Sequence, residues 1–192
     1  PFDQPDVEAA KNRAREAVDG FRKTGALPEP APTLTDQDIS VYGDAGAGSL
    51  GDALASFLDG AKDGSYVAVQ AYLPPSEDTG AALDGLRTKI RDSRRVAVTC
   101  GYGPRYLHST GQLHKGDAGQ GLFLQLTCAN PEDLAIPDEP GSKNSSISFG
   151  TLKSAQALGD LNALVEKGRK VLRLHILGND IPEAVRRITG VI

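Results

Sequence analysis

The chain has 192 residues, of which 39% are hydrophobic and 24% are charged, and these values are ordinary for one compact globular domain. Its 25 aspartates and glutamates outnumber its 21 lysines and arginines, so the net charge of −4 gives no general attraction for nucleic acid or for an anionic membrane. No apolar run approaches the roughly 20 residues that a membrane span needs, and the polar, acidic N-terminus does not resemble a signal peptide. We therefore expect neither nucleic acid nor a membrane among the partners.

The first predicted element is an amphipathic helix from Pro5 to Lys23. Asp3 can serve as its N-cap, and Gly25 is placed to end it. The three- and four-residue spacing of apolar side chains predicts one buried stripe, made of Val7, Ala10, Ala14, Ala17, Val18 and Phe21.

A proline-rich segment, Leu27–Thr35 (LPEPAPTLT), follows the helix and shows no periodicity, which indicates an extended linker. We therefore divide the chain into an N-terminal helix at residues 1–26, a linker at 27–36 and an α/β domain at 37–192.

Strands and helices alternate after the linker. Strands are predicted at Ile39–Tyr42, Tyr66–Leu73, Arg95–Tyr102, Gly121–Cys128 and Lys170–Leu177. Helices are predicted at Ser49–Leu58, Thr79–Arg91, Ser148–Lys167 and Pro182–Thr189. This alternation predicts a three-layer α/β sandwich around a mostly parallel, or mixed, sheet of about five strands.

Two connections lack a helical pattern. The polar link between Tyr102 and Gly121 indicates a loop at residues 103–119. Without a crossover helix, the two strands that this loop joins could be antiparallel or connected irregularly. The Pro/Gly/Ser-rich segment Pro137–Ser148 indicates a mobile surface loop.

The two cysteines, Cys100 and Cys128, are too few for a disulfide scaffold. Each lies in an apolar, strand-like run, which favours buried free thiols and a reducing compartment, the cytoplasm. These cysteines and the three histidines show no paired spacing of the zinc type, so no metal site is expected.

The opening residues Phe2 to Lys11 (FDQPDVEAAK) resemble the second signature of the phosphoglucose isomerase family, with Asp6 standing where the family has glycine. The resemblance implies that Lys11 reaches a sugar-phosphate substrate near its ring oxygen and phosphate, with Gln4 beside it. The alternative is an ordinary amphipathic helix whose lysine is solvated.

Three further segments look like the C-terminal region of fused transaldolase–phosphoglucose isomerase proteins: Gly101–Gly116 (GYGPRYLHSTGQLHKG), Gly121–Thr127 (GLFLQLT) and Thr151–Asp160 (TLKSAQALGD). The resemblance implies interconversion of glucose 6-phosphate and fructose 6-phosphate through an enediol, with no metal or organic cofactor. It also implies that the sugar-binding and base-bearing parts lie before Pro1. We therefore expect the chain to be inactive alone and to pack against that portion or another subunit.

The polar segment after the third predicted strand supplies cationic and neutral hydrogen-bond donors of the kind that a phosphorylated sugar needs. The candidate substrate-binding residues there are Arg105, His108, Ser109, Thr110, His114 and Lys115. A solvated or interface loop is the alternative.

Two other functional interpretations remain at this point. Gly46–Gly51 spells GxGxxG before a predicted helix, as a dinucleotide site would, but the preceding strand is short and polar. The chain could also be a non-catalytic C-terminal module that completes an assembly or binds a phosphorylated ligand.

Overall fold

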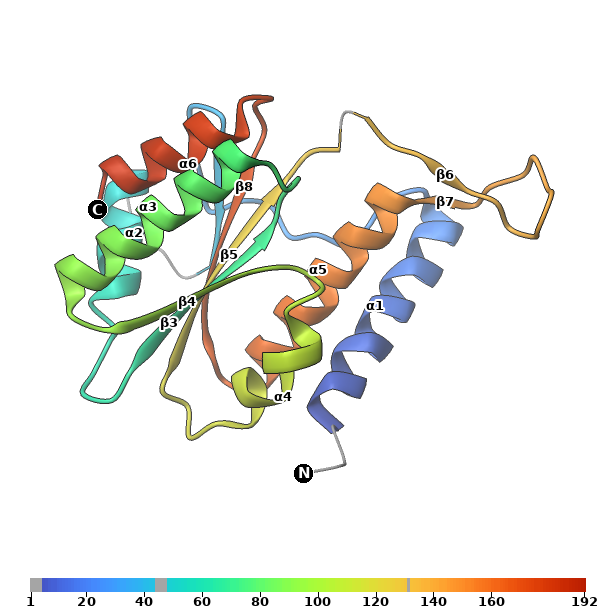
Figure 1. Ribbon diagram of the computed structural model, residues 1–192. Helices are drawn as coiled ribbons and strands as arrows, with labels where there is room; N and C mark the ends of the chain where they lie inside the picture. The colour runs from blue at the N-terminus through green and yellow to red at the C-terminus, as the bar shows by residue number, and fades with distance from the viewer. Residues whose placement is uncertain (1–4, 44–47, 131) are drawn as a thin grey trace.

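The computed structural model describes residues 5–43, 48–130 and 132–192 (Figure 1). The strands are β1 (Leu34–Asp36), β2 (Ile39–Tyr42), β3 (Tyr66–Tyr72), β4 (Ala97–Tyr102), β5 (Gly121–Cys128), β6 (Ala135–Ile136), β7 (Ile147–Ser148) and β8 (Lys170–Ile176). The helices are α1 (Pro5–Thr24), α2 (Leu50–Leu58), α3 (Glu77–Arg94), α4 (Leu107–Gly116), α5 (Phe149–Glu166) and α6 (Ile181–Gly190).

The predicted α/β sandwich is confirmed. Within the described residues, six strands form one sheet in the order β1-β2-β8-β5-β3-β4. The pairs β3–β4, β3–β5 and β5–β8 are parallel, whereas β1–β2 and β2–β8 are antiparallel. β1 is the strand of this sheet that the prediction missed, because it begins at Leu34, inside the segment that we interpreted as linker.

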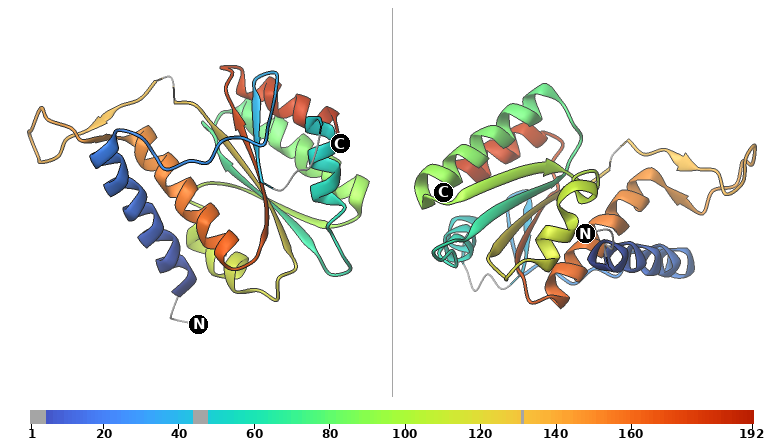
Figure 2. Two further views of the ribbon diagram at one scale, coloured as in Figure 1. Left: turned by 180° about the vertical axis from the view of Figure 1, so that it is seen from behind. Right: turned by 60° about the horizontal axis from the view of Figure 1, so that its bottom comes forward.

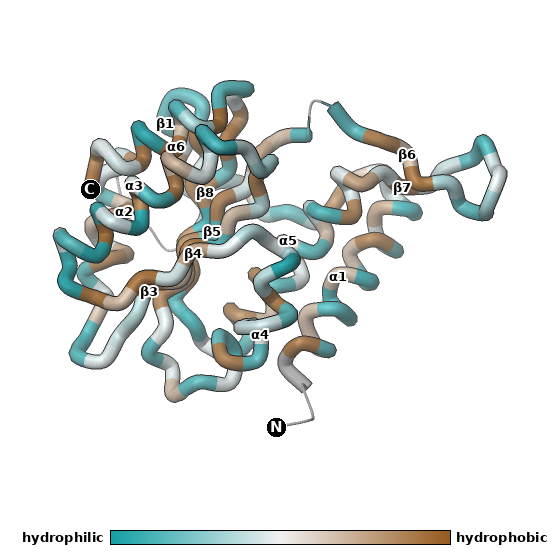
Figure 3. The backbone as a smooth tube through the Cα atoms, in the orientation of Figure 1, coloured by the Kyte–Doolittle hydropathy of each residue, from teal (hydrophilic) through white to brown (hydrophobic). Residues whose placement is uncertain are grey.

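The two faces of the sheet differ in chemistry. In β5, Leu122, Leu124 and Leu126 point to one face and enter a large apolar core beneath α2, α3 and α6. Figure 3 colours the backbone by hydropathy and shows brown, apolar residues where the central strands of the sheet cross the view. The alternate residues Gln125 and Thr127 are buried on the other face, which α5 covers.

Polar contacts hold this second face together. Gln125 donates from Nε2 to the backbone oxygen of Ala157 in α5, at 3.0 Å. Arg173 of β8 donates to both carboxylate oxygens of Glu29, each at 3.0 Å, and its guanidinium lies over the Tyr42 ring. Because Glu29 belongs to the proline-rich segment, this segment is anchored to the sheet.

α1 packs along α5 and forms an outer layer beyond it, as the two views in Figure 2 show. Ala17 and Val18 of α1 meet Ala155 and Leu158 of α5 in a small apolar cluster. Gly159 permits the close approach, since a Cβ there would lie 2.7 Å from the backbone oxygen of Ala10. The predicted amphipathic helix and its end at Gly25, which has a φ of 74°, are confirmed.

The predicted loop at residues 103–119 is wrong, because most of it forms helix α4. Its buried positions keep helical spacing, but they are Gly111, His114 and Lys115 rather than apolar residues. The hydrophobic periodicity that identifies other helices is therefore missing here. β4 and β5 are not neighbours in the sheet, and both lie parallel to β3.

Two smaller expectations are also corrected. Residues 137–146 connect β6 to β7, which pair as a short antiparallel ladder, so the last two residues of the predicted surface loop, Ile147 and Ser148, form a strand. Cys128 is buried as expected, but Cys100 lies exposed on the edge strand β4. Partial burial of its thiol, together with the nearby Asp84 carboxylate, raises the pKa of Cys100 to about 11. In the described part of the chain, no helix combines the length and apolar character needed to cross a bilayer.

Candidate functional site

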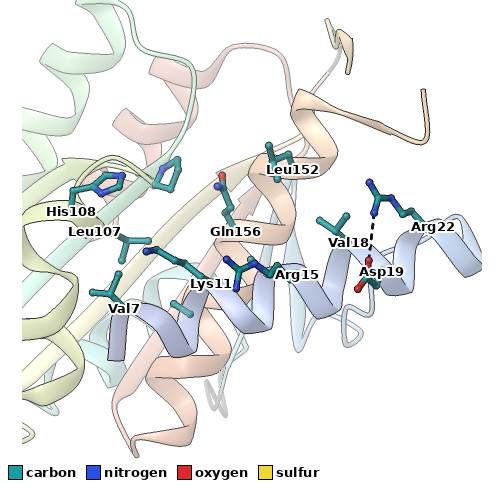
Figure 4. A pocket seen from close by; sticks show the side chains of 13 residues that line it. Val7, Lys11, Arg15, Val18, Asp19, Arg22, Leu107, His108, Leu152 and Gln156 are labelled. Carbon is teal, nitrogen blue, oxygen red and sulfur yellow. Dashed lines mark ion pairs between the residues drawn. The ribbon is translucent and has the colours of Figure 1, made fainter. Parts of the chain in front are cut away.

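A groove of about 560 Å³ runs between α1, α4 and α5 (Figure 4). We call it the α1 groove. Its lining residues are Val7, Ala10, Lys11, Ala14, Arg15, Val18, Asp19, Arg22, Pro104, Leu107, His108, Leu152 and Gln156. Glycines bring the neighbouring helices close to α1: a Cβ on Gly159 of α5 would lie 2.7 Å from the backbone oxygen of Ala10, and a Cβ on Gly111 of α4 would lie 3.3 Å from Cγ2 of Val7.

The rim of the α1 groove is basic. Arg15 donates to the side-chain oxygen of Asn12 at 2.8 Å and forms no ion pair within the described residues. Arg22 contacts Asp19 at 3.6 Å and donates to the Ser146 hydroxyl at 3.2 Å. These cations give an otherwise apolar groove an attraction for negative charge.

Lys11 lies on this rim and is available to a ligand. Its side chain is 48% exposed, and its ammonium pairs with Glu8 at 2.6 Å. The hydrogen bond from Lys11 lowers the pKa of Glu8. Such exposed pairs contribute little stability, so an incoming anion can replace Glu8 at small cost. Figure 4 shows Lys11 extending from α1 between Leu107 and Arg15, with His108 on the neighbouring helix.

A buried polar network fixes α4 against α5. Lys115 forms an ion pair with Asp160, and neither side chain is exposed. Tyr106 donates from its hydroxyl to the other carboxylate oxygen of Asp160 at 2.5 Å, and its hydroxyl also lies 3.5 Å from that of Tyr72. Burial raises the pKa of both tyrosines well above the ordinary value. The network therefore joins two neutral phenols, those of Tyr72 and Tyr106, to an ion pair in which the charges of Lys115 and Asp160 balance each other.

His114 is buried beside this network. Its ring lies 5.2 Å from the Phe123 ring and 5.7 Å from the Tyr106 ring. Nε2 of Gln70 lies 3.3 Å from Nδ1 of His114, within hydrogen-bond distance. Burial lowers the pKa of His114 to about 4, so the imidazole is neutral at physiological pH.

The C-terminal end of α4 is bonded to Arg169, which immediately precedes β8, and to Tyr66 of β3. Arg169 donates to the backbone oxygens of Lys115 and Asp117, both at 2.7 Å, and pairs with the Asp117 carboxylate at 3.1 Å. The Tyr66 hydroxyl donates to the same carboxylate at 2.9 Å. A helix with few apolar anchors is thus held at both ends by hydrogen bonds.

The structure separates the predicted site residues. Lys11 and His108 line the α1 groove. Arg105, Ser109, Thr110 and His114 instead line a second cavity of about 320 Å³, which we call the β4 pocket. Its other lining residues are Val69, Thr99, Cys100, Gly101, Tyr102 and Tyr106. Lys115 reaches neither cavity because it is fully buried with Asp160, so its predicted contact with substrate is not available in this arrangement. Gln4 and Asp3 lie outside the described residues.

Sequence reasoning missed several residues of these cavities. Arg15 follows Lys11 by four positions, so the helical spacing of basic residues could have identified the cationic rim. Gln156, which lines the α1 groove, and Asp160, which pairs with Lys115 beneath α4, carried no such signal, since polar residues within an amphipathic helix are normally solvated.

The dinucleotide interpretation loses support at the N-terminus of α2. Gly46 lies outside the described residues, but the amide of Leu50 already donates to the Asp36 carboxylate at 3.2 Å, and Ser49 accepts from the amide of Asp52 at 3.2 Å. A carboxylate in this position repels a phosphate. Among the described residues, no three His, Cys, Asp or Glu side chains gather as they would around a metal ion.

The sequence matches no protein-family model and no curated protein. Its fold is similar to the crystal structure of a hypothetical protein from Thermus thermophilus, with a TM-score of 0.57 and 19% identity over 96% of this chain. The alignment covers 42% of that protein, so the chain spans less than half of its length. At this identity the similarity shows a shared fold alone.

Proposed function

We propose that this chain forms part of a glucose-6-phosphate isomerase and that the α1 groove receives the phosphate-bearing end of the sugar. The observation that carries the proposal is the position of Lys11 on the rim of an open groove, where its ammonium pairs with the exposed carboxylate of Glu8. This is the lysine that matches the family signature. Arg15 and His108 border the same groove and can donate further hydrogen bonds to an anion.

The reaction requires a base that the groove does not supply. In the isomerisation, a base removes the proton from carbon 2 of the open-chain aldose, and the electron pair forms an enediolate. The proton returns at carbon 1, and the hydroxyl proton passes from oxygen 2 to oxygen 1. Among the described lining residues, Asp19 is the only carboxylate, and it faces Arg22. The base therefore belongs to another part of the proposed enzyme, and Lys11 stabilises negative charge on the substrate.

The apolar floor of the groove supports a second candidate function. Val7, Val18, Leu107 and Leu152 offer a surface on which a helix of an adjoining domain or subunit could pack. In this alternative the chain is a non-catalytic assembly module, and Lys11 pairs with an acidic residue of that partner.

A coupled assay with fructose 6-phosphate tests the isomerase proposal. The chain alone should show no turnover, whereas the chain joined to the portion that the resemblance places before Pro1 should be active. In that active protein, Lys11→Ala should lower kcat/KM by about tenfold to a hundredfold, the usual effect of losing a hydrogen bond to a charged group. Lys23→Ala removes an exposed lysine from the same helix and should leave kcat/KM unchanged. Equal activity of the Lys11 and Lys23 variants would contradict the proposed role.

A further inference from the structure

The β4 pocket presents a set of groups that the proposed isomerase chemistry leaves unused. It lies between the edge strand β4 and the first turns of α4, and its volume of about 320 Å³ fits a small metabolite. Arg105 is exposed at its border and forms no ion pair in the described parts of the chain. A guanidinium without an acidic partner is the group that best binds a carboxylate or phosphate.

The hydroxyls in the pocket are oriented by the backbone. Ser109 and Thr110 both donate to the carbonyl oxygen of Tyr106, at 3.0 and 3.1 Å. Because each hydroxyl uses its proton in this bond, its oxygen remains an acceptor. The two side chains therefore suit hydroxyl groups of a ligand rather than its anionic group.

The inner wall of the pocket is rigid and neutral. His114 is buried, which keeps its imidazole neutral at physiological pH, and its Nδ1 lies 3.3 Å from Nε2 of Gln70. Tyr106 is fixed by its hydrogen bond to Asp160 and by close contact with Gly101, where a Cβ would lie 2.9 Å from the Tyr106 Cβ. Since these groups are already placed, binding would cost little further ordering.

We propose that the β4 pocket binds a small hydroxylated anion, a sugar phosphate or a hydroxy acid, with Arg105 contacting the anionic group and with Ser109 and Thr110 accepting hydrogen bonds from ligand hydroxyls. The β4 pocket shares no lining residue with the α1 groove, so this inference does not depend on the isomerase proposal.

Amide chemical shifts of the ¹⁵N-labelled chain test this inference with three probes: glucose 6-phosphate, gluconate and neutral sorbitol. The phosphate, the carboxylate or both should shift the amides of Ser109 and Thr110, and the response identifies the anionic group. Sorbitol should bind much more weakly, because it offers nothing to Arg105. An absence of shifts with both anions at about 20 mM, far above a typical metabolite Kd, would overturn the inference.

Matched variants locate the bound anion. Arg105→Gln should raise the Kd by about tenfold or more, and the exposed position should leave folding intact. Lys23→Gln, which removes a distant charge, should leave the Kd unchanged. If Lys11→Gln rather than Arg105→Gln abolishes binding, the ligand occupies the α1 groove. That result would overturn the β4 pocket while supporting the proposed isomerase site.

Discussion

The buried imidazole of His114 should make the stability of the fold depend on pH. Its folded-state pKa of about 4 lies below the ordinary value of 6.5, so the unfolded chain binds the proton more tightly. The free energy of unfolding must then fall as the pH drops from 6.5 towards 4, and it should not change through this group at higher pH. Burial is the main cause, and Lys115 acts in the same direction, while Asp160 and Asp117 oppose it.

The size of this effect follows from the two pKa values. Linkage gives a loss of about 2 kcal/mol at pH 5 and about 3 kcal/mol at pH 4 from this one side chain. That is a large fraction of the roughly 5–15 kcal/mol by which a domain is stable. His114→Gln keeps a polar side chain at the position but cannot titrate in this range, so it should remove this part of the pH dependence.

Urea unfolding followed by circular dichroism at about pH 7.5 and pH 5 measures the difference. The wild-type chain should lose about 2 kcal/mol more between the two pH values than His114→Gln loses. Contributions from carboxylates and from His175 cancel in this comparison, because both proteins contain them. His108→Gln, an exposed position on the same helix, should behave as the wild type does. Equal losses in all three proteins would refute the reasoning.

Two further predictions concern the packing around α5. Lys115→Met should lower the free energy of unfolding by about 3–5 kcal/mol, because it leaves Asp160 buried without its cation. In a double-mutant cycle measured by urea unfolding, adding Asp160→Asn should recover much of this loss. Strict additivity of the two single effects would contradict the pairing. Gly159→Ala should lower the free energy of unfolding by about 1–3 kcal/mol, since the new Cβ would meet the backbone of α1. Gly85→Ala, on the open side of α3, should leave the free energy of unfolding unchanged or raise it. Equal effects of the two substitutions would argue against the close contact between α1 and α5.

Most of the fold could be predicted from local patterns. β2 and β5 have the predicted bounds, and α2 and α5 begin one residue after the predicted start because Ser49 and Ser148 serve as N-caps. These elements bury apolar faces of regular period, so their sequences carry the information directly. β1 could not be predicted in the same way, since its three residues pair only at the edge of the sheet.

The candidate site was predictable only in part. Lys11 came from a resemblance and lies at a groove, but its assigned role remains a prediction. Lys115 was interpreted as an exposed hydrogen-bond donor in a loop, because a lysine is rarely buried unless a charged partner lies beside it. Its partner, Asp160, is 45 positions away in the sequence. A pairing of such long range between two helices leaves no periodic trace in the sequence.

Helix α4 connects these observations, because it forms a wall of both cavities. Leu107 and His108 border the α1 groove, while Ser109 and Thr110 border the β4 pocket. Apolar packing would stabilise the attachment of this helix at least as well, since a buried ion pair often contributes less to the free energy of folding than hydrophobic residues of the same size. Hydrogen-bonded charges have one satisfactory geometry, however, whereas an apolar face can slide. We therefore infer that the Lys115–Asp160 pair fixes the register of α4, so that consecutive residues of this helix face two separate cavities.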